Sequence, residues 1–457
     1  MASTYLQRNT TSAATSSTKA TISVWVKLGN HVGNFNAGIF GTHNDSGDYS
    51  AGGNSQIGFY NGGLYAWFKD GSNSYYKQES TRRFRDTNAW YHLVYRFDLT
   101  ESSASDRIRV YVNNEEITSW DATDNPPNNV NIQIQKQDRN QRIGTYNFTG
   151  GTFVYFDGCM SHFHLCDGYS YAPTEFGETD STTGEWKIKT SPNVQYGNNG
   201  FFVLKDGNSG TDQSPNSNNF TVTGGTLTKT EDNPSNIFAT MNPLIGSNSQ
   251  TFSNGNNTVA VTGGASAGGY STLGMSSGKY YFEVKQTAYS SQNRLVVGIT
   301  SDPANDDRRN RYLGQDAHSY SYGAENGNKT NSGSASSYGN SFTTGDILGV
   351  ALDLDNNKLY FSKNGTWQNS GDPTSGSTGT GAAYTVTAAA SSLTGFYHFA
   401  FGDESASHSV TAQANFGNGY FGTTAVASAG TNASGNGIFE YDVPAGYTAL
   451  STKGLNL

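Results

Sequence analysis

The sequence is poor in cysteine and in charged residues. Two cysteines in 457 residues exclude the disulfide framework that holds many small secreted domains together. Charged residues make up 14% of the chain, and acidic residues outnumber basic ones by 37 to 28. The electrostatic footprint of a nucleic-acid-binding protein is therefore missing, and we expect no nucleic-acid partner. The net charge of −9 is typical of a solvated, mildly acidic surface.

Long apolar segments are missing as well. No run of 18 apolar residues occurs, so we expect no membrane insertion. The first residues, MASTYLQRNTTSAATSS, contain no basic segment followed by an apolar run, and no secretory signal is expected. The protein should therefore be made in a cytoplasm. Heptad repeats are also absent, which argues against a coiled-coil stalk.

Glycine and aromatic residues are abundant instead. The chain contains 55 Gly, 28 Tyr and 25 Phe residues, and Leu and Ala runs at helical spacing are absent. This composition favours short strands joined by many turns and predicts an all-β fold. The length predicts two or three domains, each large enough for its own core.

The clearest strand pattern is GDILGVALDLDNNKLYFSKNGTW, residues 345–367. Its first half alternates apolar side chains on one face, at Leu348, Val350, Leu352 and Leu354. Alternation of this kind indicates a strand with one buried face. Asn and Asp at 355–357 and the pair Asn364-Gly365 suit tight turns. The stretch thus predicts strand, hairpin, strand, hairpin.

The same stretch carries a family resemblance. Together with GKYYFEV at Gly278–Val284 and VVGIT at Val296–Thr300, it resembles a SPRY domain in order and spacing. The resemblance extends from about Ile245 to the C-terminus. SPRY domains are concanavalin-like β-sandwiches that bind partners through loops at one edge and are not enzymes. The resemblance implies such a sandwich over residues 251–457.

The first part of the chain has its own strand patterns. Residues 22–28 alternate, and residues 57–68 read as two aromatic strands around the turn Asn61-Gly62-Gly63. The order SVWVK, NAWYHLVYRFD, RIRVYVNNEEI, continuing through FDGCMSHFHLCDGYSYAPTEFGE, resembles a laminin-G/concanavalin-like lectin domain. That resemblance implies a lectin-like sandwich over residues 1–230. The predicted architecture is two concanavalin-like jelly-roll β-sandwiches in tandem, joined by an irregular linker over residues 231–250.

The connecting region mixes turn residues with isolated aromatic and aliphatic residues. These side chains are expected to anchor the region on the sandwiches rather than leave it loose; they are Phe201, Phe202, Phe220, Ile237 and Phe238. The whole arrangement, from YLQR through EDNPSNIFATMNP to VPAGYTALSTKGLNL, resembles bacteriophage particle proteins that pair these two sandwiches. Those proteins are mostly known from marine phages and are described as tail-fibre or other virion structural components. The resemblance implies a virion location and other virion proteins as partners. We also expect a homo-oligomer, with a trimer as one form.

Catalytic patterns are weak. Glycosidases of the lectin-like fold place two carboxylates at alternate positions of one strand, flanking the sugar bond. The nearest approach is Asp353-Leu354-Asp355, which lacks a glutamate and lies at a hairpin. Glu115 and Glu116 are adjacent and would face opposite ways in a strand. We therefore expect no enzyme and no required cofactor, with glycoside hydrolysis as the weakest alternative.

Three side chains have the spacing of a metal site. His162, His164 and Cys166 share one face of an uninterrupted strand and can ligate zinc. A fourth ligand is not evident, and packing on an aromatic-rich strand is the favoured interpretation. Cys159 lies seven residues before Cys166, on the opposite face, so both thiols are expected to be free.

Two loops offer oxygen ligands of the kind that calcium prefers. Asn44, Asp45 and Asp48 lie in HNDSGD, and three aspartates lie between residues 302 and 307 in SDPANDDRR. Solvated turns contain the same residue types. Calcium binding, chiefly at the first loop, and an ordinary turn are therefore both open.

Sugar binding needs flat rings for the C–H faces of the pyranose and a few polar groups for its hydroxyls. Tyr65 and Trp67 lie two apart and share one face of their strand. Tyr60 shares no face with them by simple counting. The pair predicts a glycan-binding surface on the first sandwich.

The second sandwich contains another candidate region, residues 302–342. A connection of this length is uncommon unless it is functional or itself contains strands. Aromatic residues and arginine on loops are good binding anchors, and they occur here with a histidine at Arg311, Tyr312, His318, Tyr320 and Tyr322. The alternative is that Tyr320 and Tyr322 are ordinary strand residues in a Tyr-rich protein.

Three functions remain open. The first is a virion-surface protein of the tail-fibre or adhesin type that binds host surface glycans. The second is a head or tail decoration or connector protein that binds only other virion proteins. The third and weakest is a polysaccharide-degrading enzyme, which would require paired carboxylates in one groove. The residues do not separate the first two.

Overall fold

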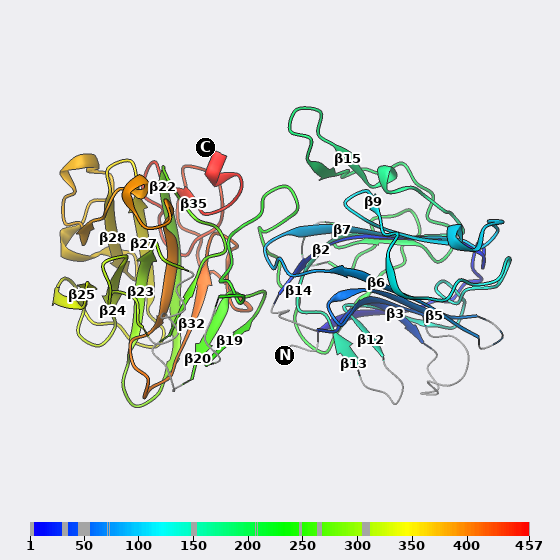
Figure 1. The fold of residues 1–457 in the computed structure, drawn as a ribbon, viewed down its shortest axis with the longest axis horizontal. Helices are drawn as coiled ribbons and strands as arrows, with labels where there is room; N and C mark the ends of the chain where they lie inside the picture. Colours follow the sequence, from blue (N-terminus) through cyan, green and yellow to red (C-terminus); the bar gives the residue numbers. More distant parts are fainter. Residues whose placement is uncertain are drawn as a thin grey trace. The chain divides into compact units, whose positions relative to one another are not determined.

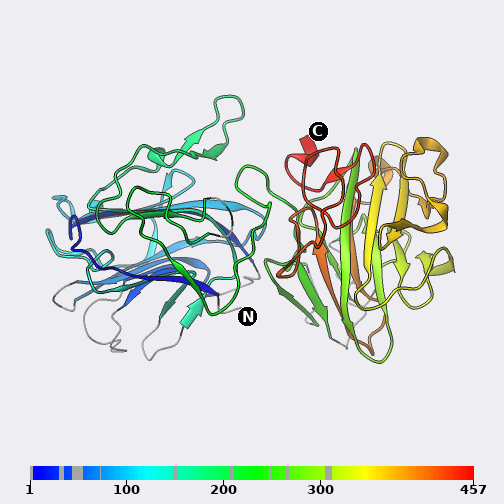
Figure 2. The ribbon, with the colours of Figure 1, turned by 180° about the vertical axis from the view of Figure 1, so that it is seen from behind.

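The computed structural model describes residues 4–29, 35–43, 55–70, 72, 74–147, 153–205, 207, 209–245, 249–262, 267–303 and 311–456. Contacts divide the chain into two units, Met1–Lys229 and Thr230–Leu457, and in two opposite views each unit consists of layered β-sheets (Figure 1, Figure 2). The structure is 44% strand and 4% helix. The predicted all-β fold with two sandwiches in tandem is confirmed.

The first unit contains an eight-stranded and a six-stranded sheet. The larger has the order β10 (Trp120–Thr123), β6 (Tyr75–Arg83), β5 (Gly63–Lys69), β4 (Ser55–Tyr60), β3 (Ala37–His43), β11 (Asn140–Ile143), β1 (Tyr5–Asn9), β18 (Thr221–Thr223). The smaller has the order β17 (Phe201–Val203), β14 (Gly158–Asp167), β2 (Lys19–Leu28), β7 (Trp90–Asp98), β8 (Ile108–Val112), β9 (Glu115–Glu116).

Alternating side chains place the core of this unit between its two sheets. Ile22, Val24 and Val26 of β2 meet Ile57 and Phe59 of β4 in one buried cluster. The odd-numbered residues of β2 therefore face outward. Two hairpins lie beside the sheets, β12 (Thr145–Asn147) with β13 (Phe153–Tyr155) and β15 (Gly177–Thr179) with β16 (Trp186–Ile188).

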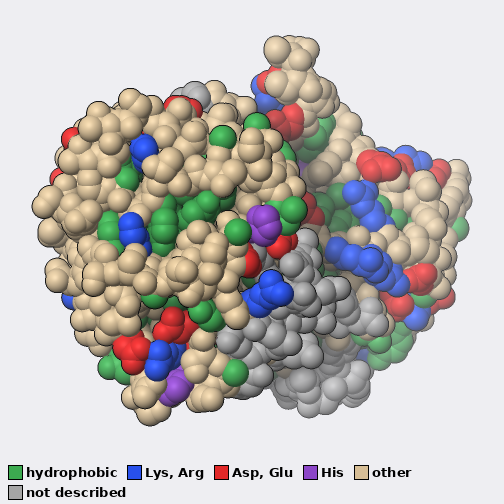
Figure 3. All heavy atoms as spheres, turned by 60° about the vertical axis from the view of Figure 1, so that its left-hand side comes forward, with side chains coloured by type: hydrophobic (Ala, Val, Ile, Leu, Met, Phe, Trp, Pro, Cys, Tyr) green, Lys and Arg blue, Asp and Glu red, His purple; other side chains and the backbone are tan. Residues whose placement is uncertain are grey.

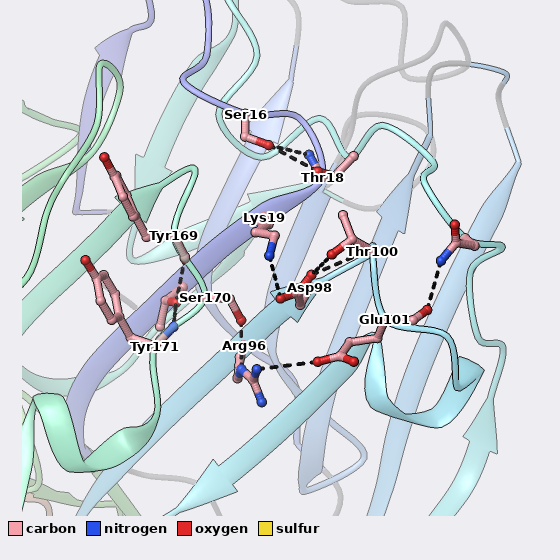
Figure 4. A network of polar contacts seen from close by, with 12 residues as sticks. Ser16, Thr18, Lys19, Arg96, Asp98, Thr100, Glu101, Tyr169, Ser170 and Tyr171 are labelled. Atoms are coloured by element: carbon pink, nitrogen blue, oxygen red, sulfur yellow. Dashed lines mark hydrogen bonds and ion pairs between the residues drawn. The ribbon is translucent and has the colours of Figure 1, made fainter.

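The segment after β14, residues 168–200, attaches to the outer face of the six-stranded sheet. The Thr21 hydroxyl donates to the Tyr169 carbonyl at 2.9 Å and accepts from the Tyr171 N–H at 2.8 Å. Arg96 donates to the Ser170 hydroxyl at 2.7 Å (Figure 4). Both sheet residues, on β2 and β7, thus hold the first turn of this segment.

The second unit contains a nine-stranded and a six-stranded sheet. The larger has the order β19 (Gln250–Ser253), β20 (Thr258–Val261), β32 (Val410–Asn415), β22 (Lys279–Tyr289), β27 (Ile347–Asp353), β28 (Lys358–Lys363), β29 (Thr366–Trp367), with β30 (Tyr384–Thr385) on β28 and β35 (Thr448–Ala449) on β22. The smaller has the order β21 (Ala267–Tyr270), β31 (His398–Asp403), β23 (Leu295–Thr300), β24 (Ser319–Gly323), β25 (Asn328–Asn331), β26 (Ser334–Ser337). A third, short pair joins β33 (Tyr420–Phe421) and β34 (Thr424–Ala425).

The predicted hairpins of residues 345–367 are present. β27 pairs with β28 from Leu348 opposite Lys363 to Asp353 opposite Lys358, and β28 pairs with β29. Asn364 and Gly365 have φ angles of 48° and 78°, as a two-residue hairpin turn of the primed type requires. The alternating apolar side chains of β27 enter the core between the two sheets, so the stretch lies at the centre of its unit.

The predicted linker is part of the second unit. Phe238, Ala239 and Met241 are buried, the last two in the core of that unit, and the N–H of Ala239 bonds the carbonyl of Leu450 at 2.9 Å. The prediction of a separate linker over residues 231–250 is therefore wrong for residues 231–245. Phe238, one of the predicted anchors, packs against Tyr281 and Tyr447 in a buried cluster of the second unit.

Helical structure among the described residues is limited to short 3-10 turns, at Ala104–Asp106, Pro173–Glu175, Gln368–Ser370, Gly376–Thr378, Ala389–Ser391 and Gly454–Asn456. None of the helices in this part of the chain has the length and apolarity needed to cross a bilayer. On the face drawn in Figure 3, charges of both signs are scattered and hydrophobic side chains form small separate patches.

Candidate functional site

The outer face of β4 and β5 carries the aromatic residues of the first unit that were considered for sugar binding. Tyr60 pairs with Gly63, and Gly58 pairs with Tyr65, so Tyr60 and Tyr65 face the same way, and their rings lie 5.6 Å apart. The prediction that Tyr60 shares no face with Tyr65 is therefore wrong. Simple counting fails because the turn between the strands reverses the chain and resets the alternation.

Tyr65 is on the predicted face, but the hairpin of β12 and β13 covers it. Its side chain is 8% exposed, and its ring lies 6.1 Å from that of Tyr146. Burial raises the pKa of Tyr65 above its ordinary value. Tyr146 is itself buried and donates its hydroxyl to the Phe59 carbonyl at 3.1 Å. Tyr65 therefore cannot offer a ring face to a ligand, and this part of the predicted site is corrected.

Trp67 remains accessible beside a residue that the sequence did not single out. Its ring stacks on Tyr75 of β6 at 4.9 Å and 29°, and Tyr75 is 49% exposed. Lys77 pairs directly with Trp67 and bonds Glu79 at 3.4 Å. We call Trp67, Tyr75, Lys77 and Glu79 the aromatic shelf. It combines ring faces with a polar pair, which are the groups that a sugar ring requires.

Tyr75 was detectable in principle. It lies opposite Lys69 in β6, and Trp67 and Lys69 alternate on one face of β5. The signal is therefore an aromatic residue in the next strand, β6. It pairs with the residue two places after Trp67 in β5. Without the register of β5 and β6, that position cannot be identified.

The candidates of the second unit divide into two groups. Tyr320 is 6% exposed and Tyr322 fully buried, because β24, paired with β23 and β25, turns these side chains towards the core. Their rings pack in the core, and Thr387 N–H donates to the Tyr320 hydroxyl at 3.2 Å. Both are therefore corrected to core strand residues, and residues 302–342 do contain strands, β24 to β26.

The other three candidates precede β24. Arg311 and His318 are exposed and Tyr312 is half-buried. The His318 carbonyl accepts from the Ser301 N–H at 2.9 Å, which closes the base of this connection. Residues 304–310 lie outside the described residues, so the structure does not bring these three side chains into one defined site.

The calcium candidates receive no support. Asn44, Asp45 and Asp48 lie outside the described residues. Asp302 is buried two residues after β23 ends, and the two aspartates at 306 and 307 also lie outside the described part. Within the described ranges, no group of three or more His, Cys, Asp or Glu side chains is arranged to hold a metal ion.

The histidine and cysteine set on β14 is built for packing. A β-bulge interrupts β14 between Ser161 and His164, and His162 has a φ of 48°, so the strand is not uninterrupted as predicted. His164 stacks on Phe202 at 3.9 Å, and its Nδ1 lies 2.9 Å from the Tyr196 hydroxyl. Burial lowers the pKa of His164 well below its usual value. Neither Cys159 nor Cys166 forms a disulfide within the described residues, as predicted.

A second buried histidine holds the segment of residues 168–200 in place. His92 stacks against Trp25 at 4.8 Å. The indole N–H of Trp186 donates to its Nδ1 at 3.0 Å, which leaves Nε2 to donate to the Ser23 hydroxyl at 2.8 Å. Burial lowers the pKa of His92 to about 3. The ring is therefore neutral and fixed in one tautomer.

Glu283 has the corresponding place in the second unit. Its carboxylate accepts from the N–H groups of Glu440 and Tyr441, each at 2.9 Å. It also accepts from the Tyr281 hydroxyl at 3.1 Å and the Asn415 amide at 3.2 Å. Burial raises the pKa of Glu283 to about 7, and these four donors oppose the shift. The residue secures the C-terminal part of the chain to β22.

The remaining carboxylates considered for catalysis do not form a pair in a groove. Asp353 is buried and bound to Lys279 at 3.0 Å, whereas Asp355 is exposed on the following turn and accepts from the Gly278 N–H. Glu115 and Glu116 are exposed and paired with separate arginines, at 3.0 Å and 3.7 Å.

Comparison with known proteins agrees with this architecture. A model of the Concanavalin A-like lectin/glucanases superfamily matches residues 2–175, and a SPRY domain model matches residues 279–391. The chain therefore combines a laminin-G/concanavalin-like domain with a SPRY domain, as the resemblances implied. Domains of these two kinds are typically non-catalytic.

The similar proteins are mostly much longer than the shared region. Ran-binding protein 9 of Danio rerio is 38% identical over 89 residues, which are 19% of this chain and 14% of that protein. Ran-binding protein 9 of Homo sapiens is 38% identical over 89 residues, 12% of its length. The SPRY domain of human HERC1 matches with 18% identity and a TM-score of 0.30, over 38% of this chain and 96% of that one. Stonustoxin matches with 16% identity and a TM-score of 0.28, over 39% of this chain and 27% of that one.

Proposed function

We propose that this protein is a non-enzymatic structural protein of a bacteriophage virion, of the tail-fibre or adhesin type, that binds host surface glycans. The glycan-binding role depends on the aromatic shelf. The virion location, the other virion proteins as partners and the homo-oligomer, with a trimer as one form, depend on the resemblance of the whole sequence to phage particle proteins.

The shelf supports sugar binding through its geometry. Tyr75 is 49% exposed, and it is held in one orientation by the Trp67 ring that stacks on it at 4.9 Å and by the Lys69 ammonium, 4.8 Å from its ring centre. A ring held in this way loses little conformational freedom when it binds the C–H face of a sugar. The ion pair of Lys77 and Glu79 at 3.4 Å supplies a donor and an acceptor for hydroxyl groups.

A glycan array with the full chain tests this proposal. The wild-type protein should bind a subset of glycans, and Tyr75→Ala should weaken that binding by about tenfold, as expected for one aromatic contact. Tyr289→Ala is the matched control because Tyr289 is 40% exposed and lies in the second unit. Equal binding by wild type and Tyr75→Ala would contradict the shelf as the site.

A decoration or connector protein is the second candidate, and one observation favours it. Leu393 and Phe396 of the second unit are 56% and 47% exposed in the connection that leads to β31. Exposed large apolar side chains close together suit a protein partner. The relatives named for binding Ran likewise bind a protein.

Immunogold labelling of phage particles separates the two. Label at the tail tip or fibres, together with glycan binding, would support the adhesin. Label over the head shell without glycan binding would favour decoration. Absence of label from all particles would remove the virion assignment.

A further inference from the structure

A cavity of about 320 Å³ lies in the second unit. Its walls come from the start of β22, from the turn after β27 and from the C-terminal segment that pairs with β22. The polar and aromatic side chains that line it are Lys279, Tyr280, Asp355, Ser434, Tyr447 and Thr448. The volume is at the lower end of ligand pockets, which span roughly 300–1,000 Å³.

Tyr280 also lines this cavity. The residue is 4% exposed, but its hydroxyl is not one of the fully buried polar atoms that lack a partner. A Cβ placed on Gly278, another lining residue, would lie 3.2 Å from that hydroxyl, so the hydroxyl is at the cavity wall. A ligand hydroxyl group can donate to or accept from the Tyr280 hydroxyl in place of water.

The charges at the cavity are largely compensated. Lys279 binds Asp353 at 3.0 Å, and its ammonium also lies 5.9 Å from the centre of the Tyr447 ring. Asp355 Oδ1 accepts from the Gly278 N–H at 2.9 Å, which leaves Oδ2 to accept a hydrogen bond from a ligand. With the lysine already paired and a carboxylate present, the cavity does not favour an anion.

Two hydroxyl groups complete the polar wall. Thr448 Oγ1 accepts from the Asn436 amide at 2.9 Å, so its own proton is available to a ligand. Ser434 Oγ donates to Asn432 Oδ1 at 2.7 Å and already accepts from the Asn436 N–H at 3.2 Å. The wall therefore offers an acceptor at Asp355, a donor at Thr448 and the amphoteric Tyr280 hydroxyl.

We propose that this cavity binds one neutral sugar residue of a glycan. A pyranose carries several hydroxyl groups and no charge, which matches a wall of mixed donors and acceptors without a free cation. The site is separate from the aromatic shelf, and the inference does not depend on the virion location.

Saturation-transfer NMR on the full chain tests the inference, with methyl α-mannopyranoside, methyl β-glucopyranoside, methyl β-galactopyranoside and N-acetylneuraminic acid as probes. At least one neutral glycoside should bind with a dissociation constant in the millimolar range, as expected for few hydrogen bonds. Tyr280→Phe, which removes only the hydroxyl, should weaken this binding about fivefold to tenfold. Tyr289→Phe on the same strand should leave it unchanged.

Three results would overturn the inference. They are absence of transfer to every neutral glycoside, tighter binding of N-acetylneuraminic acid than of all neutral probes, and wild-type affinity in Tyr280→Phe. If Tyr280→Phe does not fold, Asp355→Asn on the exposed turn gives the same readout, since the amide oxygen can still accept from the Gly278 N–H. Binding that is lost in Tyr75→Ala but kept in Tyr280→Phe would assign the sugar to the aromatic shelf, which supports the proposed function and overturns this site.

Discussion

The two units differ in the kind of buried titratable side chain that helps to hold a later segment of the chain against one sheet: a histidine in the first and a glutamate in the second. The first unit uses His92, which receives the indole N–H of Trp186. The second uses Glu283, which receives the N–H groups of Glu440 and Tyr441. Burial disfavours the charged form in both cases, so it lowers one pKa and raises the other.

This difference gives the two units opposite dependence on pH. The pKa of His92 is about 3 in the folded protein and about 6.5 in an unfolded chain. The unfolded first unit therefore binds a proton in that range that the folded unit does not, and stability falls as pH falls below about 6.5. The pKa of Glu283 is about 7 when folded against about 4.3 when unfolded. Between these two values the folded second unit retains a proton that the unfolded chain has released. Its stability therefore falls as pH rises towards 7.

Removal of the Glu283 carboxylate should have the largest effect on the stability of the second unit. In Glu283→Gln, the amide keeps one acceptor but turns an NH2 group towards donors that surround the site. We expect the second unit to lose about 3 kcal/mol of unfolding free energy, measured by hydrogen exchange of the β22 amides. The first unit should be unaffected. Glu325→Gln, at an exposed ion pair with Arg294, is the matched control, and equal loss in both variants would contradict the role of Glu283.

Acidification should destabilise the first unit next most strongly. Between pH 7 and pH 5, we expect its unfolding free energy to fall by about 2 kcal/mol because of His92. His164, whose pKa burial also lowers, adds in the same direction. Denaturant unfolding followed by hydrogen exchange in β7 gives the readout. A first unit as stable at pH 5 as at pH 7 would show that His92 is not held neutral.

The same change of pH should stabilise the second unit. From pH 7 to pH 5, its unfolding free energy should rise by up to about 2 kcal/mol as Glu283 takes up its proton. Asp403, whose pKa burial raises to about 6, contributes with the same sign, whereas His398, whose pKa burial lowers, opposes it. Exchange of β22 amides at the two pH values measures the effect. In Glu283→Gln, the share of this increase that depends on Glu283 should disappear. A second unit that loses stability on acidification would contradict the opposite pH dependence of the two units.

A change in a turn should have the smallest effect. Gly365 has a φ of 78°, and a Cβ there would lie 2.6 Å from Tyr441, the residue whose N–H binds Glu283. Gly365→Ala should therefore cost the second unit about 1–2 kcal/mol, seen as a lower thermal midpoint. Gly345→Ala is a useful control, because its φ is also positive but no atom lies within 4 Å of its Cβ. Equal losses would show that Tyr441 does not contribute.

The sequence predicts those features that depend on neighbours along the chain. Alternation and turn residues locate the hairpins of residues 345–367, and resemblance identifies both sandwiches. The features that it misses depend on register or on distant contacts. Tyr60 changes face because a hairpin resets the alternation, and Tyr65 is lost to a ligand because Tyr146, from another hairpin, covers it. His92 and Glu283 are inconspicuous because nothing local shows that a strand residue will be buried beneath a later segment.

The hairpin over Tyr65 also has a consequence for how much aromatic surface the first unit displays. Tyr146 approaches the sheet at Gly38, Gly41 and Gly58, where an added Cβ would lie 2.5 Å, 3.1 Å and 2.9 Å from its atoms. At Gly58 the nearest atom is the Ala37 carbonyl oxygen, whereas at Gly38 the three nearest atoms all belong to the hairpin. We therefore expect Gly38→Ala to push the hairpin away from Tyr65. The aromatic surface available to a sugar is thus limited by glycine residues. Substitution of a glycine could enlarge it without adding any aromatic residue.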